Sequence, residues 1–289
     1  MNYRQKICVK VITFPEGFDE EDRLGCKTPC CVSQLKLAST TDDDNYKNDI
    51  TGIPIKTSDV TDIVDFVIEK CGNPIPLPNL GEILVAPQDD LLVGFIFDWK
   101  QYLIAYGVGE YKITVNFTIS GVIGGYLYGQ YDLKNYSITN AMYTSRIWSE
   151  YNSFFQRELM DFTNSNFKDS VRFFGTFGTR QPETEINQLI TKGRKSEKIT
   201  RENLNKWTLN TDPLSIDITR QLLNWHFLNE DVCLMSDHNK YNHDYLLFDI
   251  PVVLQETATV EYLDKDRGAK ITAIFGDRKK LDKSYYNLQ

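Results

Sequence analysis

The segment 237–244 combines two histidines with two aspartates, side chains that bind zinc and other transition metals. It reads Asp-His-Asn-Lys-Tyr-Asn-His-Asp, so His238 and His243 are five residues apart. On a helix this spacing points the imidazoles apart, and on a strand it places them on opposite faces. Only a tight loop brings them together, and Asn and Asp are ordinary turn residues. We therefore interpret the segment as a polar loop, with a metal site as the alternative.

Cysteines near the N-terminus offer a second set of metal ligands. Cys26, Cys30 and Cys31 lie close enough in sequence to supply thiolates to zinc, and Cys8 or Cys71 would complete a tetrahedral site. Structural zinc sites usually use two separated pairs, which this spacing does not provide. Six cysteines in 289 residues are also few for a disulfide framework. We predict free thiols, no bound metal and no cofactor.

Three further patterns do not amount to a catalytic site. Gly121–Gly125 lies between two predicted strands, whereas a phosphate-binding loop joins a strand to a helix. His226 has no Ser or Cys nearby in a nucleophile elbow, so we interpret it as packing against Trp225 or as polarity at a helix end. Glu183 and Glu185 are two of 40 acidic residues, among which chance pairs are expected. We predict no catalytic residue and no enzyme.

The charge balance excludes some classes of partner. Forty Asp and Glu against 32 Lys and Arg give a net charge of -8, and an acidic surface is poorly suited to a phosphate backbone. We expect no specific nucleic-acid partner. The basic run Lys192–Lys198 could meet nucleic acid or an acidic partner, but we favour a solvated hairpin tip. No signal peptide or apolar run of membrane-spanning length is evident, so we expect a cytosolic chain without a membrane partner.

Most of the sequence alternates apolar and polar residues with the period of two that is typical of strands. In residues 110–120 one face carries Tyr111, Ile113, Val115, Phe117 and Ile119, and the other is polar. Glycines punctuate residues 91–138, as hairpins and bulges require. We predict a mainly β fold with antiparallel, sandwich-like sheets. Further strands are expected at 7–13, 34–38, 60–70, 170–178, 257–263 and 269–275.

Helix is scarce in this pattern. Ile218, Leu222 and Trp225 recur at offsets of four and three, which predicts one short helix near residues 215–227. A shorter turn is expected at 200–206. No other segment indicates a helix.

A change of composition divides the chain. The polar stretch 152–169 is interrupted by several phenylalanines, and we place a domain boundary near residue 165. We expect one β-rich domain at 1–165 and a second at 166–289, with a projecting arm at 180–200.

Nine tyrosines between residues 102 and 151 concentrate in the glycine-punctuated region. Tyrosine provides amphipathic contact area and is enriched at protein interfaces. We attribute part of the excess to core packing and the rest to a sheet face buried against neighbouring subunits.

The carboxy-terminal half contains a series of segments that resembles a known group of proteins. The segments are Arg172–Ile186, Arg194–Lys198, Thr208–Asp212, Leu222–His226, Val260–Asp264 and Ala269–Ala273. In order and composition they resemble β-rich structural proteins encoded in the tail regions of phages that infect Bacteroidetes, crAss-like gut phages included. The likeness covers roughly the last 120 residues.

This resemblance implies a subunit of a virion tail or neck, such as a ring, hub or baseplate protein assembled in the host cytoplasm. Its partners would be copies of itself in a ring and other virion tail or neck proteins. A strand-rich chain with polar hairpins suits a ring with heterologous contacts, in which the arm at 180–200 could augment a neighbour's sheet edge. We expect a non-enzymatic structural subunit. The alternative is a glycan-binding or glycan-cleaving β-sandwich, because exposed aromatic and acidic side chains also suit sugars.

Overall fold

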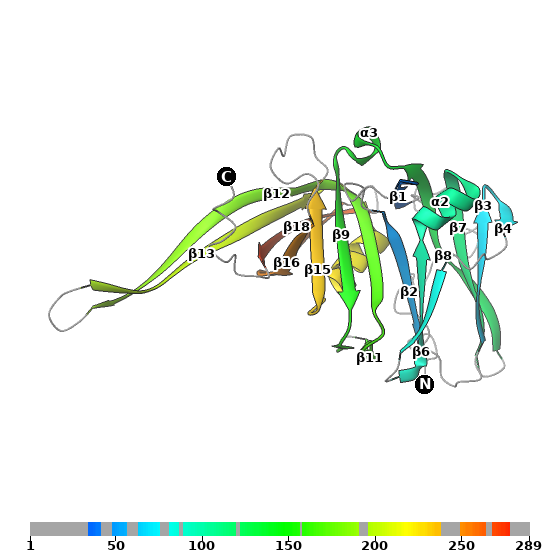
Figure 1. Cartoon of the computed structure of the whole chain (residues 1–289), viewed down its shortest axis with the longest axis horizontal. Helices are drawn as coiled ribbons and strands as arrows, with labels where there is room; N and C mark the ends of the chain where they lie inside the picture. The colour runs from blue at the N-terminus through cyan, green and yellow to red at the C-terminus, as the bar shows by residue number, and fades with distance from the viewer. Residues whose placement is uncertain are drawn as a thin grey trace.

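The chain folds into two β-rich units that lie side by side, with a long hairpin projecting from one of them (Figure 1). The computed structural model describes residues 34–41, 48–56, 63–75, 81–86, 89–119, 122–156, 158–190, 196–237, 249–263 and 268–277. The mainly β prediction is confirmed. The strand expected at 7–13 lies outside the described residues.

The first unit contains two sheets and a helix. One sheet has five strands in the order β1-β8-β7-β3-β4, and the other has three in the order β2-β6-β5. Neighbouring strands are antiparallel except β1 and β8, which are parallel. The elements are β1 Gln34–Ala38, β2 Ile50–Lys56, β3 Ile63–Lys70, β4 Asn73–Ile75, β5 Gly81–Ala86, β6 Asp89–Asp98, α2 Trp99–Tyr106, β7 Gly109–Ile119, β8 Val122–Asn135 and α3 Ile138–Ala141.

The core of this unit lies between the two sheets. Tyr111, Ile113 and Val115 of β7 are fully buried there, as the alternating pattern predicts. They pack with Phe66 of β3 and Phe97 of β6. The glycine-rich segment after β7 opens β8, which pairs with β7, and this agrees with the hairpin interpretation.

Helix α2 was not expected within residues 91–138, which we interpreted as a region of strands, hairpins and bulges. Asp98 caps its start, because the side chain accepts a hydrogen bond from the backbone N of Lys100. Gly107 ends it with a φ of 78°. The buried residues are Trp99, Tyr102 and Leu103, at offsets of three and four. This short helical period was concealed because apolar strand residues flank it on both sides.

The second unit is a closed barrel of six strands. Its order is β13-β12-β9-β15-β16-β18, and β18 returns to pair with β13. All of these pairs are antiparallel. The elements of this part are β9 Thr144–Tyr151, β10 Phe154–Phe155, β11 Met160–Asp161, β12 Phe167–Ile190, β13 Ser196–Thr211, β14 Leu214–Ser215, α4 Ile216–Gln221, η2 Leu222–His226, β15 Val232–Asp237, β16 Ile250–Leu254, β17 Thr259–Leu263 and β18 Gly268–Asp277.

Apolar side chains from all six strands fill the barrel. They include Ile147 of β9, Phe173 of β12, Met235 of β15 and Phe275 of β18. Strand β9 belongs to this barrel by its hydrogen bonds to β12 and β15, although it precedes the boundary that we placed near residue 165.

The helix expected near residues 215–227 is present, in two parts. Helix α4 begins after Ser215, whose side chain accepts a hydrogen bond from the backbone N of Ile218. It continues into η2, a single turn of π-helix that buries Trp225 and His226. The turn expected at 200–206 is wrong, since those residues lie within β13. Their polar composition was taken as a turn signal because the sequence shows no alternation of apolar and polar residues there.

A third apolar cluster joins the two units. It combines Leu92 and Ile96 of β6 with Tyr151 of β9, Phe167 of β12 and Trp225 of η2. The small sheet therefore packs on the first core with one face and on residues of the second unit with the other.

Candidate functional site

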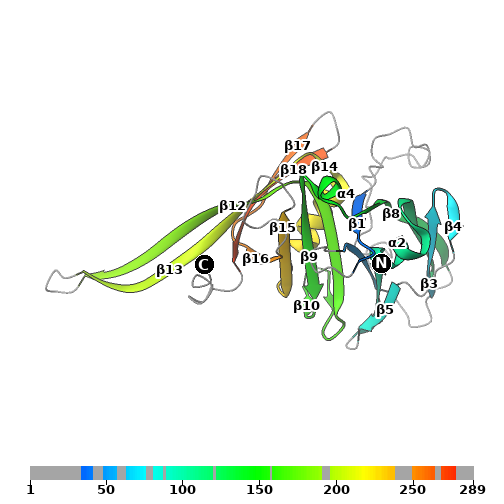
Figure 2. The same ribbon diagram turned by 45° about the horizontal axis from the view of Figure 1, so that its top comes forward.

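The β12–β13 hairpin extends well beyond the barrel as a two-stranded ribbon (Figures 1 and 2). Strand β12 pairs with β9 only from Phe167 to Phe174, and β13 pairs with β18 only from Lys206 to Asn210. The two strands continue to pair with each other from Pro182, opposite Asn205, to Ile190, opposite Ser196. Among the described residues no other strand pairs with this outer part.

A two-stranded ribbon that pairs only with itself among the described residues is poorly stabilised. An isolated two-stranded hairpin is marginally stable in water, because it has no second layer on which to bury a face. Each of its strands also presents an edge of unpaired backbone groups that can accept another strand. The ribbon thus has the features of a segment that binds another surface.

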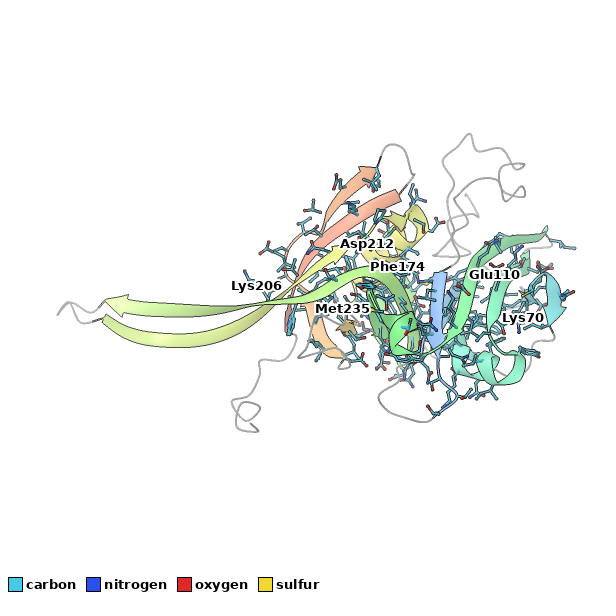
Figure 3. All side chains as sticks on the ribbon, turned by 90° about the horizontal axis from the view of Figure 1, so that it is seen from above. Lys70, Glu110, Phe174, Lys206, Asp212 and Met235 are labelled. Carbon is cyan, nitrogen blue, oxygen red and sulfur yellow. The ribbon has the colours of Figure 1, made fainter. Side chains whose placement is uncertain are left out.

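At its root the ribbon bends away from β9. Gly175 follows the last residue of β12 that pairs with β9, and it pairs with Thr211 of β13. Its φ is 152°, and a Cβ there would lie 2.7 Å from the backbone O of Asn210. Figure 3 shows Phe174 and Asp212 together at this root, where the backbone N of Asp212 donates to the O of Phe174 at 3.1 Å. The bend therefore requires glycine.

Buried charges hold the root against the first unit. Arg172 of β12 makes a bidentate ion pair with Asp49, with Nε 2.8 Å from Oδ2 and Nη2 3.0 Å from Oδ1. Arg146 of β9 places its Nε 3.4 Å from Asp49 Oδ1. Lys36 of β1 donates from Nζ to the backbone O of Ser170 at 2.7 Å. All four charged side chains are at most 3% exposed.

The three cations control the ionisation of Asp49. Burial by itself raises the pKa of this carboxyl group, but Arg172, Arg146 and Lys36 together lower it below the ordinary value. Asp49 also accepts a hydrogen bond from the backbone N of Leu37 at 2.8 Å. The carboxylate is therefore held ionised inside the molecule, where it links β1, β9 and β12.

A second buried polar cluster lies on the same part of β12. Asp169 accepts hydrogen bonds from the backbone N of Gly52 at 2.9 Å and from Gln221 Nε2 at 2.8 Å. His226 lies with Nε2 3.2 Å from Asp169 Oδ2, and its Nδ1 is 2.8 Å from Ser149 Oγ. These contacts connect the root of the ribbon to β2, β9 and the α4–η2 helix.

Ser149, His226 and Asp169 have the residue types of a nucleophilic triad, but they are at most 1% exposed. A substrate has no access to the Ser149 hydroxyl, so we assign the cluster a structural role. The sequence interpretation of His226 was incomplete. The residue is buried next to Trp225, yet it also contacts two strands, and Ser149 lies 77 positions away in the chain. No local sequence pattern could have signalled this contact.

The other candidate residues are not brought together by the described structure. Cys8, Cys26, Cys30, Cys31, His238 and His243 lie outside the described residues. Cys71 is exposed after β3, and Cys233 is buried in the barrel. Within the described ranges no group of three or more His, Cys, Asp or Glu side chains could hold a metal ion. Glu183 and Glu185 lie on the ribbon.

The tyrosines belong mostly to the core. Tyr102, Tyr111, Tyr128, Tyr131 and Tyr151 are at most 8% exposed, and burial raises the pKa of Tyr111 to about 12. Of the nine tyrosines, Tyr143 alone is exposed, at 45%. Core packing therefore accounts for most of the excess that we had partly attributed to subunit contacts.

A shallow depression of about 410 Å³ lies next to β10. Phe154, which is 49% exposed, and Leu228, which is 41% exposed, line it together with Glu230 and Asp231. Asp231 Oδ2 accepts hydrogen bonds from the backbone N of Asn152 and from Ser153 Oγ. The depression thus combines exposed apolar and acidic side chains in a fixed arrangement.

Comparisons with known proteins do not assign this chain to a class. No protein-family model and no curated protein matches the sequence. In the part of the chain that the structure describes, we find no helix of the length and apolar character that crossing a bilayer demands.

Proposed function

We propose that this chain is a non-enzymatic structural subunit of a phage virion tail or neck, and that copies of it form part of a ring-like assembly with other virion proteins. The observation that carries the proposal is the ribbon formed by residues 182–190 and 196–205, which pairs only with itself among the described residues. The resemblance of the carboxy-terminal half to phage tail proteins supplies the biological setting.

Two physical arguments support a role in assembly. A ribbon that stands alone gains stability when a neighbour covers its faces or edges. Its root is fixed in the molecule by the buried ion pair of Arg172 with Asp49 and by the contacts of Asp169. A rigidly anchored ribbon can place its outer part on a neighbour at a defined angle, which a closed ring requires.

Charge also favours contact between copies. The hairpin from residue 182 to residue 205 contains five Lys or Arg and four Asp or Glu, a balance of +1. The whole chain carries -8, so the remaining residues carry -9. The ribbon of one copy is therefore attracted to the body of another.

The direct test compares the full chain with a variant in which residues 183–204 are replaced by a two-residue Asn-Gly turn. The cut lies outside the barrel pairs, so the thermal unfolding midpoint should not change. We expect the full chain, purified alone or with the products of neighbouring genes, to form closed oligomers by mass measurement and cryo-electron microscopy, and the shortened chain to remain monomeric. Equal assembly of the two chains, or a full chain that stays monomeric under every condition, would rule the proposal out.

The same preparations address the glycan alternative. A glycan-binding protein would retain a small oligomeric state and bind sugars on an array whether or not the ribbon is present. We expect no sugar binding by either chain. Saturable sugar binding by both chains, without assembly, would favour the alternative.

A further inference from the structure

We propose that the depression next to β10 is the binding site for the ribbon of a second copy of this chain. The inference rests on the proposed function, in which the ribbon mediates assembly, and identifies the surface that receives it. The surface is defined by Phe154 of β10, by Leu228, Glu230 and Asp231 after η2, and by the end of β9 at Tyr151.

The position of the depression suits a contact between copies that are arranged head to tail. Strand β9 pairs with β12 from Thr144, opposite Phe174, to Tyr151, opposite Phe167. The ribbon leaves β12 at the Thr144 end, and the depression lies at the Tyr151 end. Seven residues of strand separate these ends by roughly 23 Å. In Figure 2 the ribbon points away from β10, so its own depression stays available to another copy.

The charges of the two surfaces are complementary. The sequence 192–198, which runs from the connection between β12 and β13 into β13, contains four basic residues and one acidic residue. The depression presents Glu230, which is exposed, and Asp231, which is half-buried. Opposite charges across a contact of this kind favour encounter and fix the register of the partners.

The depression also has the apolar component that a stable contact needs. Phe154 and Leu228 are large side chains exposed in one hollow, and an aromatic anchor surrounded by polar residues is typical of the centre of an interface. Leu189 and Ile190 directly precede the basic run. The sequence of the ribbon therefore places apolar residues next to its basic run.

The walls of the depression are already in place without a partner. Asn229 Nδ2 donates to the backbone O of Glu150 at 2.9 Å, and its Oδ1 accepts from the backbone N of Asp231 at 2.8 Å. Asp231 is fixed in turn by Ser153 Oγ at 2.9 Å. A preorganised surface loses little conformational entropy on binding, which favours affinity.

The test uses two full-length variants that each lose one side of the contact. The depression variant carries Phe154→Ser and Glu230→Lys, and the ribbon variant carries Arg194→Glu, Lys195→Glu and Lys198→Glu. A matched control carries Tyr262→Ser and Glu261→Lys on β17, where another exposed aromatic and acidic pair lies on an edge strand. All three variants should unfold at the temperature of the unmodified chain.

We expect each of the first two variants to assemble at least about tenfold more weakly than the unmodified chain, a loss of roughly 1.4 kcal/mol, and the β17 control to assemble normally. Mixed in equal amounts, the two variants should form dimers and nothing larger. In each dimer the intact ribbon of one variant binds the intact depression of the other. The two surfaces left over are the mutated ribbon and the mutated depression, which cannot bind a further copy.

A second measurement locates the contact directly. The photo-crosslinking residue benzoylphenylalanine replaces Phe154 in a chain labelled with ¹⁵N, which is mixed with unlabelled full chain. Crosslinks should join the labelled depression to residues 186–201 of the unlabelled copy. Crosslinks that stay within one chain, or that reach a different part of the second copy, would contradict the inference.

The outcomes separate this inference from the proposed function. If the unmodified chain assembles and the depression variant assembles equally well, the inference fails while the structural role stands. If the β17 control loses assembly instead, the edge of β17 receives the ribbon and the inference also fails. If the unmodified chain never assembles and gives no crosslinks between copies, both proposals fail.

Discussion

Asp49 and the three cations around it are the most consequential charges in the described structure. Removing a cation would leave a buried carboxylate without its best partner, and an unpaired buried charge is costly. We predict that Arg172→Met lowers the free energy of unfolding by about 3–5 kcal/mol. The midpoint of urea denaturation measures this change. As a control, Lys134→Met removes a cation that is 48% exposed beside Asp132 and should change the free energy of unfolding by less than about 0.5 kcal/mol. Similar losses of unfolding free energy in both variants would show that the buried ion pair contributes no more to stability than an exposed one.

The same carboxylate predicts how stability depends on pH. The pKa of Asp49 is lowered in the folded chain, whereas an unfolded Asp has a pKa of about 3.9. The stabilisation is therefore fully present above about pH 4 and is lost as the pH falls toward the folded pKa. Asp49→Asn lacks this contribution, so the difference in unfolding free energy between the two chains should shrink as the pH falls below about 4. Chemical denaturation across this range measures it. A difference that stays constant would mean that the pKa of Asp49 is the same in both states.

Asp217 provides a contrast of opposite sign. Burial raises the pKa of this carboxyl group in α4, so the folded chain favours its protonated form and the residue opposes folding once it is ionised. Asp217→Asn should therefore keep the loss of stability below about pH 4 that Asp49 produces. Asp49→Asn should not show this loss. Comparing the two variants separates the buried ion pair from the general effect of losing a carboxylate.

At the scale of elements, the ribbon formed by β12 and β13 is the feature that we expect to change most on assembly. Trypsin should cut the isolated monomer within residues 192–201, where basic residues are dense and where no other described strand pairs with the ribbon. In the assembled state a neighbour covers the ribbon, so these cuts should be slowed while cuts elsewhere in the chain are not. Mass spectrometry of the fragments over time measures both rates. Equal rates at residues 192–201 in the monomer and the assembly would contradict the prediction.

The sequence predicts the elements whose pattern is local. The strands at β1, β3 and β7 and the helix after Ser215 follow from period and capping alone. Helix α2 was not predicted because its eight residues lie inside a long apolar region that resembles a run of strands. The full length of β12 and β13 was not predicted because residues 180–185 and 200–206 are mostly polar and do not alternate with apolar residues. The candidate sites depend on contacts between residues that are far apart in the chain. Asp49 and Arg172, for example, are 123 residues apart, and no local sequence pattern indicates such a contact.

At the scale of the whole molecule, one barrel strand joins the two surfaces that assembly would use. Strand β9 carries Arg146 in the buried ion cluster at the ribbon's root and ends at Tyr151 beside the depression. The apolar cluster that includes Leu92 of β6 and Trp225 of η2 packs the first unit against the same end. Both surfaces are thus fixed on one rigid framework, which is what repeated contacts at a constant angle need.

This arrangement predicts that assembly weakens as salt is added. The hairpin from residue 182 to residue 205 carries a balance of +1 and the rest of the chain -9, and Glu230 in the depression is exposed. The Debye length falls from about 10 Å at 0.1 M to about 3 Å at 1 M ionic strength, so the attraction between copies should be largely screened at the higher value. We expect the dissociation constant from analytical ultracentrifugation to rise several-fold over this range. The effect should be smaller in a Glu230→Gln variant, which removes one acidic group from the depression. If salt instead strengthens assembly, or if Glu230→Gln retains the full salt dependence, apolar burial or other acidic residues would be driving the contact.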